Sequence, residues 1–179
     1  MKIEFGNQSH VGNVRKQNED YLGSFECRAG TVFIVCDGMG GHKGGAMAST
    51  MAVDAFKHYL QKELNSDQPI NKGLYDAFVY ANKLIFDKAQ RNNDLQGMGT
   101  TCVMLLVDLS GNCHYAHIGD SRIYEFKNGF LKRLTKDHSY VQTLIDGGII
   151  SDEEAERSNG SPKRHQSCKP FSCLMPCSP

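Results

Sequence analysis

The order of strand and helix patterns along the chain constrains its fold more than any other feature. Short apolar stretches come first and predict strands at 3–5, 21–25 and 31–36. The third stretch is continuous and β-branched, so we expect it to be buried on both faces. Two stretches with apolar side chains at helical spacing follow and predict helices at 46–64 and 70–91, each packing one face on a core.

Strand patterns return in the second half of the chain as two hairpins. Ser110-Gly111 joins the stretches 101–109 and 112–118, and Asn128-Gly129 joins 121–126 and 130–135. A short helix is expected at 140–145, ending at Gly147-Gly148. Strands, then two helices, then strands indicate an α+β fold rather than a strictly alternating parallel one.

Composition excludes several classes of protein. The chain has 179 residues, of which 40% are hydrophobic, and this suits one packed domain. Lys and Arg number 20, as do Asp and Glu, so the formal charge is zero and a general nucleic-acid binder is not expected. No apolar run approaches the roughly 20 residues of a membrane helix, and the N-terminus lacks the apolar core of a secretion signal. We therefore expect a cytoplasmic protein with no membrane partner.

The last part of the chain differs in character from the rest. Residues 158–179 show neither helical nor strand periodicity. We therefore expect residues 1–157 to form the domain and 158–179 to form an irregular, disordered or out-of-frame tail.

The cysteines divide between these two parts. In the domain, Cys27, Cys36, Cys102 and Cys113 fit reduced, mostly buried thiols. In the tail, His165, Cys168, Cys173 and Cys177 have the ligand types of a zinc site, but unpaired thiols are the favoured interpretation.

Three acidic clusters lie beside glycines or at strand ends. Asp37 closes an apolar strand and is followed by Gly38, where a backbone carbonyl can approach an ion closely. Asn18-Glu19-Asp20 follows Arg15, whose guanidinium matches phosphate oxygens. Gly119-Asp120-Ser121-Arg122 forms the third cluster. Each cluster taken alone has a simpler interpretation: the first fits a polar turn after a strand, the second a solvated charged loop, and the third a turn with a surface salt bridge. Taken together, the clusters offer the oxygen ligands that Mg²⁺ and Mn²⁺ prefer.

The three clusters and further motifs resemble the metal-dependent protein serine/threonine phosphatases of type 2C, with a glycine loop like that of the bacterial branch. The resemblance covers about 3–157 and rests on motifs in the family order, which are Arg15-x-x-Asn18-Glu19-Asp20, Asp37-Gly38-Met39-Gly40-Gly41, Met98-Gly99-Thr100-Thr101, Gly119-Asp120-Ser121-Arg122, Leu134-Thr135-x-Asp137-His138-Ser139 and Gly148-Ile149-x-Ser151-x-Glu153-Glu154-Ala155. It implies a four-layer α-β-β-α sandwich, of which this chain would form an incomplete part.

The resemblance also implies an activity and roles for named residues. Phosphoserine and phosphothreonine of proteins would be hydrolysed by water activated by Mg²⁺ or Mn²⁺. Asp37 would bridge two ions, Gly38 would offer its carbonyl to one, and Asp20 would hold the second with Glu19 beside it. Asp120 would belong to a weaker metal site. Arg15 would bind the substrate phosphate, and a serine/threonine kinase and its targets would be the partners.

Histidines are not the expected general acid. Some family members carry a histidine directly after the Asp-Gly pair, where this chain has Met39. His42 could face the cleft, although we do not favour this. We expect His138 to anchor a loop through hydrogen bonds and His117 to be structural.

The family pattern is incomplete in this sequence. The late Ser-Asp-Gly and Asp-Asn motifs, which complete the first metal site in the family, do not occur, so we expect a C-terminally truncated domain that binds one ion at most, weakly, with impaired activity. Two alternatives stay open: a catalytically dead phosphoprotein-binding module that keeps Arg15, and a non-functional gene fragment.

Overall fold

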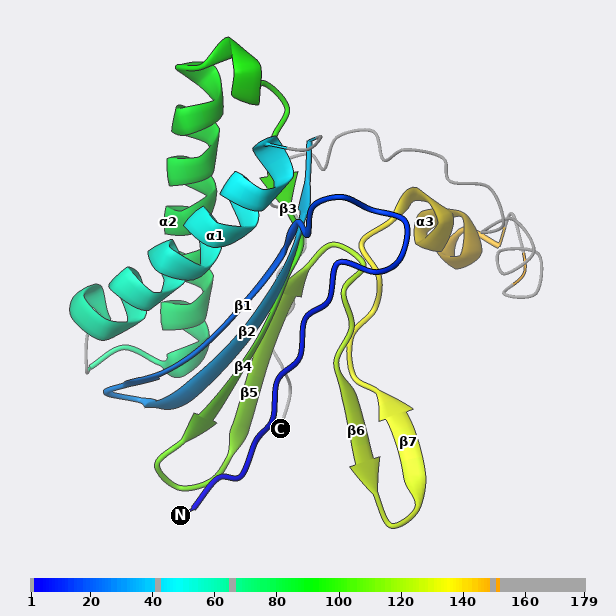
Figure 1. Ribbon diagram of the computed structural model, residues 1–179. Coiled ribbons are helices and arrows are strands. Elements are labelled where there is room, and N and C mark those ends of the chain that lie inside the picture. Colours follow the sequence, from blue (N-terminus) through cyan, green and yellow to red (C-terminus); the bar gives the residue numbers. More distant parts are fainter. Residues whose placement is uncertain (1, 41–42, 65–66, 149–150, 152–179) are drawn as a thin grey trace.

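The computed structural model describes residues 2–40, 43–64, 67–148 and 151, and the predicted tail lies outside these residues. Its centre is an antiparallel sheet in the order β1-β2-β4-β5, with β3 pairing the end of β2. Two helices lie together on one side of this sheet, and a separate hairpin stands away from them (Figure 1). The strands of the main sheet are β1 (Asp20–Cys27), β2 (Gly30–Met39), β3 (Gly99–Thr100), β4 (Cys102–Asp108) and β5 (Cys113–Ile118).

The two long helices confirm the prediction from apolar spacing. Helix α1 spans Gly44–His58 and α2 spans Ile70–Gln90. The expected end of the first helix near residue 64 is also met, because a π-helical turn, Tyr59–Glu63, continues α1. A short 3₁₀ turn, Asn93–Leu95, leads from α2 to β3.

The hydrophobic core lies between these helices and one face of the sheet. Alternate residues of β2, such as Val32 and Ile34, point into it and are no more than 2% exposed. Phe56 of α1 and Phe78 of α2 meet edge to face there, with ring centroids 4.7 Å apart. Small residues of α1 such as Ala52 let the helix pack closely on the strands. This core fixes the sheet, and therefore the strand ends that carry the candidate site.

Among the described residues, no helix covers the opposite face of the sheet, and the expectation that 31–36 is buried on both faces is wrong. The burial of β2 alternates, and Val35 is 46% exposed. The N-terminal segment runs beside this face, where the rings of Phe5 and Phe33 meet edge to face at 5.0 Å. The prediction of a strand at residues 3–5 is also wrong. A strand needs a hydrogen-bonded neighbour, and this segment is not paired with another strand in the described structure.

Both predicted hairpins are present. Asn128 and Gly129 have φ angles of 53° and 82°, as the tight turn between β6 (Tyr124–Lys127) and β7 (Phe130–Arg133) requires. In the β4–β5 turn, the Asp108 carboxylate accepts hydrogen bonds from the amides of Ser110 and Asn112, both at 2.8 Å. Bonds from Asn112 hold the pKa of Asp108 well below its usual value.

The short helix α3 spans Tyr140–Asp146, as predicted, and Ser139 caps it by accepting a hydrogen bond from the Gln142 amide at 3.2 Å. The element order therefore confirms the α+β class. No helix in the described part of the chain is long and apolar enough to cross a membrane.

Candidate metal and phosphate site

The site forms where β1 and β2 lie side by side at the end of the sheet. Their antiparallel register places Asp20 directly opposite Asp37, and both residues keep access to solvent although neighbouring groups partly cover Asp37. The Asp20 amide donates to the Asn18 side-chain oxygen at 3.0 Å, which orders the turn that leads into β1. Two carboxylates that lie far apart in sequence are therefore neighbours on one surface.

The charges around Asp37 show which other predicted residues lie near it. Partial burial raises the pKa of its carboxyl group, and the negative charges of Asp20 and Asp120 raise this pKa further. Arg15 acts in the opposite direction, and its Nη1 lies 3.9 Å from Glu19 Oε2. The structure thus gathers Arg15, Asp20 and Asp120 around Asp37, with Glu19 beside Arg15. Such a concentration of negative charge would be relieved by a cation.

Gly38 occupies a place that only glycine fits. It is buried, and its amide donates to the Glu19 carbonyl at 3.1 Å. A Cβ at this position would collide with the backbone of Gly45 at the start of α1, and would lie 2.7 Å from the Glu19 carbonyl oxygen. The close packing of β2 against α1 therefore explains the glycine, while a metal-binding role for its carbonyl stays a prediction.

Two threonines hold Asp37 in place, a role that their residue type alone does not reveal. The Asp37 amide donates to Thr101 Oγ1 at 3.1 Å, and the Thr101 amide donates to the Asp37 carbonyl at 2.8 Å. Thr100 Oγ1 donates to the same carbonyl at 3.0 Å. Thr101 Oγ1 also lies 2.6 Å from Ser121 Oγ, which links Asp37 to the loop that carries Asp120. The signal was the motif Met98–Thr101 itself, in which two hydroxyl side chains follow a glycine.

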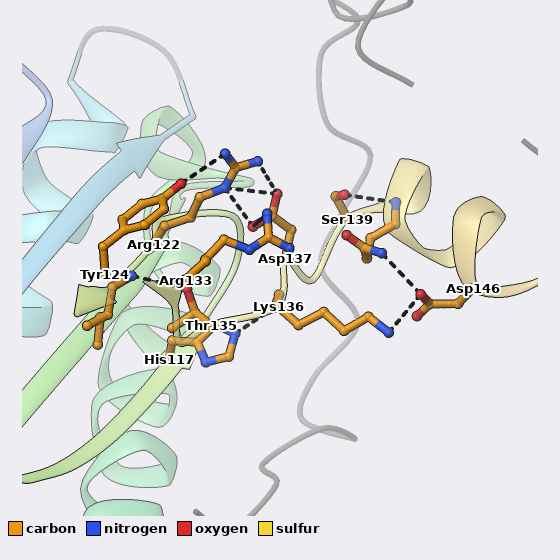
Figure 2. Close-up of polar contacts among 11 residues, drawn as sticks. His117, Arg122, Tyr124, Arg133, Thr135, Lys136, Asp137, Ser139 and Asp146 are labelled. Atoms are coloured by element: carbon orange, nitrogen blue, oxygen red, sulfur yellow. Dashed lines mark hydrogen bonds and ion pairs between the residues drawn. The ribbon is translucent and has the colours of Figure 1, made fainter. Parts of the chain in front are cut away.

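The Asp120 loop, defined here as residues 119–122, packs on Thr101 and on the segment after β7. Gly119 has a φ of +94°, is buried, and accepts a hydrogen bond from the His138 amide at 2.9 Å. Arg122 forms a two-pronged ion pair with Asp137, shown in Figure 2. The partner of Arg122 could not be read from the sequence, because the two residues lie 15 positions apart.

The histidines have structural partners, in line with the predictions for His117 and His138. Their rings stack with centroids 4.4 Å apart, and His117 Nε2 lies 2.7 Å from the Lys136 carbonyl oxygen. His42 lies outside the described residues. Met39 ends β2 and is paired with Gly99 of β3.

The residues present fit a hard divalent cation in kind. Carboxylate oxygens are the ligands that Mg²⁺ and Mn²⁺ prefer, and Asp37 lies among like charges. Within the described ranges, however, the structure contains no preformed group of three or more acidic, histidine or cysteine side chains arranged to hold a metal. The chemistry therefore fits a metal, while the complete ligand set stays a prediction.

The stacked histidines predict a fall in stability below neutral pH. Burial lowers the pKa of His138, as does the charge of His117, while Asp137 acts in the opposite direction. The folded chain therefore binds a proton at His138 less readily than the unfolded chain, whose histidine has a pKa of about 6.5. The stabilising effect is present above that pH and is lost as the pH falls below it.

We expect the urea midpoint to fall between pH 7.5 and 5.5 and the fall to shrink in His138→Gln. His10→Gln, at an exposed N-terminal position, serves as the control and should behave like the unmodified chain. An equal fall in all three proteins would contradict the assignment to His138.

Similarity to known proteins identifies the family to which this chain belongs. The family model described as Protein phosphatase 2C matches residues 8–157. The chain belongs to the protein phosphatase 2C family. It is 41% identical over 160 residues to the serine/threonine phosphatase stp of Listeria welshimeri, a match that covers 87% of this chain and 62% of that protein.

Solved structures extend the similarity to the fold. The serine/threonine phosphatase Stp1 from Staphylococcus aureus matches with a TM-score of 0.73 and 34% identity, covering 86% of this chain and 63% of the other. The catalytic domain of PstP in complex with two manganese ions matches with a TM-score of 0.66 and 39% identity, covering 80% and 60%. The prediction of a type 2C phosphatase fold is therefore confirmed. The chain spans less than two thirds of the length of each of these proteins.

Proposed function

We propose that this chain acts on phosphoserine and phosphothreonine of proteins as a metal-dependent hydrolase. The observation that carries the proposal is the placement of Asp20 opposite Asp37, with Asp120 and Arg15 close enough to alter the pKa of Asp37. These residues lie within 8–157, the range that matches the family model, and a similar member of the family is named a serine/threonine phosphatase. Phosphorylated proteins would be the substrates, a serine/threonine kinase and its targets the partners, and the cytoplasm the location.

The residues divide into those that would bind phosphate and those that would hold metal. Arg15 is largely exposed, with 71% of its side chain accessible, and its guanidinium can bind phosphate oxygens. Glu19, Asp20, Asp37, Gly38 and Asp120 would hold Mg²⁺ or Mn²⁺, which when bound lowers the pKa of water and neutralises charge on the phosphate. Thr100 and Thr101 orient Asp37 through its backbone.

We further propose that metal binding is weak, with one ion at most near Asp20 and Asp37. A divalent ion binds through the summed charge of its oxygen ligands, and Mg²⁺ otherwise keeps its water. The described residues place Asp20 and Asp37 together without a third carboxylate in a preformed ligand group. Turnover should therefore be lower than in a relative with a full metal site.

A second candidate is a phosphoprotein-binding module, which is favoured by the same incomplete ligand set and by the exposed Arg15. The two candidates differ in turnover. Such a module would bind a phosphothreonine peptide through Arg15 and release it unchanged, with or without Mn²⁺. A chain that neither binds nor hydrolyses the peptide would instead be a non-functional fragment.

The experiment is hydrolysis of a phosphothreonine peptide and of p-nitrophenyl phosphate with and without Mn²⁺. We expect measurable turnover with Mn²⁺, because the proposed reaction needs a divalent cation at the acidic residues of the site. EDTA should abolish this turnover by removing the cation. Isothermal titration with Mn²⁺ on the same protein should show weak binding of one ion. Binding of the peptide without turnover would exclude the enzyme and favour the module, and two tightly bound ions would contradict the weak-site proposal.

A further inference from the structure

The Asp120 loop is held against a second segment, residues 134–138, which we call the anchor segment. The two run side by side beyond the β6–β7 hairpin. At one end, the Leu134 amide donates to the Ile123 carbonyl at 2.9 Å, and the Ile123 amide donates to Thr135 Oγ1 at 3.1 Å. At the other end, the His138 amide donates to the Gly119 carbonyl at 2.9 Å. Backbone hydrogen bonds therefore fix both ends of the loop, and Asp120 lies between them.

A side-chain ion pair connects Arg122, the last residue of the loop, to Asp137 of the anchor segment. Arg122 Nε lies 3.0 Å from Asp137 Oδ1, and Arg122 Nη2 lies 2.7 Å from Asp137 Oδ2. The Asp137 side chain is only 11% exposed, and Arg133 Nη1 lies 3.8 Å from its Oδ1. Figure 2 shows Arg122 and Asp137 directed toward each other, with the Tyr124 hydroxyl on the far side of the guanidinium. Two parallel charge-assisted hydrogen bonds fix orientation as well as distance, which a single contact does not.

The loop is also connected to the site on its other side. Ser121 Oγ lies 2.6 Å from Thr101 Oγ1, and Thr101 in turn holds the amide of Asp37. Ser121 thus contacts the sheet, while its neighbour Arg122 contacts the anchor segment. The backbone bonds hold the loop only at Gly119 and at Ile123. Movement of Arg122 away from Asp137 would therefore let the residues between these two points shift about the Ser121 contact, and Asp120 would be displaced relative to Asp37.

We propose that Arg122 and Asp137 are a positioning pair that sets the place of Asp120 relative to Asp37. The functional part of this proposal rests on the proposed function, in which Asp120 serves the metal site. In this role neither residue needs to touch the substrate or the reacting atoms. Their effect passes through the Asp120 loop. A purely structural ion pair would differ, because its loss would weaken the whole fold rather than this one loop.

The test compares Asp137→Asn and Arg122→Lys with Asp137→Glu in the full chain. Asparagine removes the charge at nearly constant shape, lysine keeps the charge but loses the two-pronged geometry, and glutamate keeps the carboxylate. Asp146→Asn is the matched control, because it removes the carboxylate of a neighbouring ion pair, to Lys136 at 2.7 Å, which does not involve the Asp120 loop. If Asp137→Asn does not fold, Arg122→Lys decides the result.

The first readout is amide hydrogen exchange of the metal-free chain followed by mass spectrometry. In Asp137→Asn and Arg122→Lys, exchange in peptides that cover 119–123, which include the hydrogen-bonded Ile123 amide, should be at least about 10-fold faster. Peptides from α2 and β2 should keep their rates. Asp137→Glu should restore part of the protection, and Asp146→Asn should leave the loop unchanged. Unchanged loop exchange in the first two variants, or an equal increase throughout the chain, would overturn the proposal.

The second readout is Mn²⁺-induced broadening of nuclear magnetic resonance signals from the isotope-labelled chain. Signals from residues 119–122 should broaden less, relative to those of residues 20 and 37, in Asp137→Asn than in the unmodified chain. Equal broadening in both proteins would overturn the functional part of the proposal. If the unmodified chain shows neither broadening nor turnover, the proposed function fails, and the hydrogen-exchange result still decides whether Arg122 and Asp137 hold the loop.

Discussion

Asp37→Asn is expected to abolish Mn²⁺-dependent hydrolysis and, at the same time, to stabilise the metal-free chain. Asparagine keeps the shape of the side chain but removes the negative charge that a cation requires. Loss of groups that merely support a metal ligand typically costs about 10–100-fold in affinity or activity, so loss of the central carboxylate should cost at least about 100-fold.

The expected gain in stability follows from the raised pKa of Asp37. Burial and the charges of Asp20 and Asp120 disfavour the ionised form in the folded chain. The folded chain therefore holds the proton to a higher pH than the unfolded chain, so stability falls as the pH rises through the unfolded value of 3.8, and it stays lower at neutral pH. An uncharged side chain removes this unfavourable effect.

Thermal melting at pH 7 with EDTA and with Mn²⁺ measures both effects on one protein. We expect Asp37→Asn to melt at a higher temperature than the unmodified chain in EDTA, and to gain less from Mn²⁺. Asp54→Asn, at an exposed position on α1, is the control and should change neither quantity. A lower melting temperature of Asp37→Asn in EDTA would show that the carboxylate has a stabilising partner instead.

Gly38→Ala is expected to destabilise the fold more than a glycine-to-alanine substitution at any other glycine of the site. The new Cβ would collide with the backbone at Gly45 and lie 2.7 Å from the Glu19 carbonyl oxygen. Backbone atoms cannot turn aside as a flexible side chain can, so either α1 or the residues before β1 must move. Overpacking of this kind costs about 1–3 kcal/mol, occasionally more, and we expect the upper end of that range.

Urea denaturation gives the free energy of unfolding for this comparison. Gly6→Ala is the matched control, because a Cβ there meets nothing within 4 Å. Activity of Gly38→Ala should fall together with stability, since the same movement shifts Glu19 and Asp20. Equal stability of the two alanine variants would show that α1 adapts to the added methyl group at little cost.

Much of the fold could be predicted from local sequence signals. The hairpin turn at Asn128-Gly129 needs positive φ angles at both positions, a requirement that the residue types reveal directly. The helices were predicted because one face of each must pack on a core. The environment of 31–36 could not be predicted in the same way, because apolar residues on the second face do not say whether another layer covers them.

The site was predictable as residue types but not as an arrangement. Asp37 and Asp20 could be recognised beside Gly38 and Arg15, yet their direct opposition depends on the register of β1 and β2. That register is set at a turn, Arg28-Ala29, which carries no strong sequence signal. The pairing of Arg122 with Asp137 depends on the path of the intervening hairpin, so no local pattern could reveal it.

The position of β4 in the sheet has a consequence for the order of folding. The β1–β2 hairpin and the α1–α2 pair can form from nearby residues, whereas β2 and β4 pair Ile34 with Met104 across a loop that contains both helices. Closing such a loop costs entropy before its contacts form, so we expect this pairing late on the folding pathway. During synthesis at roughly 5–20 residues per second, β2 therefore waits several seconds for its partner strand. In that interval the packing of α1 on β2 shields the apolar side of a strand whose edge is still open to other chains.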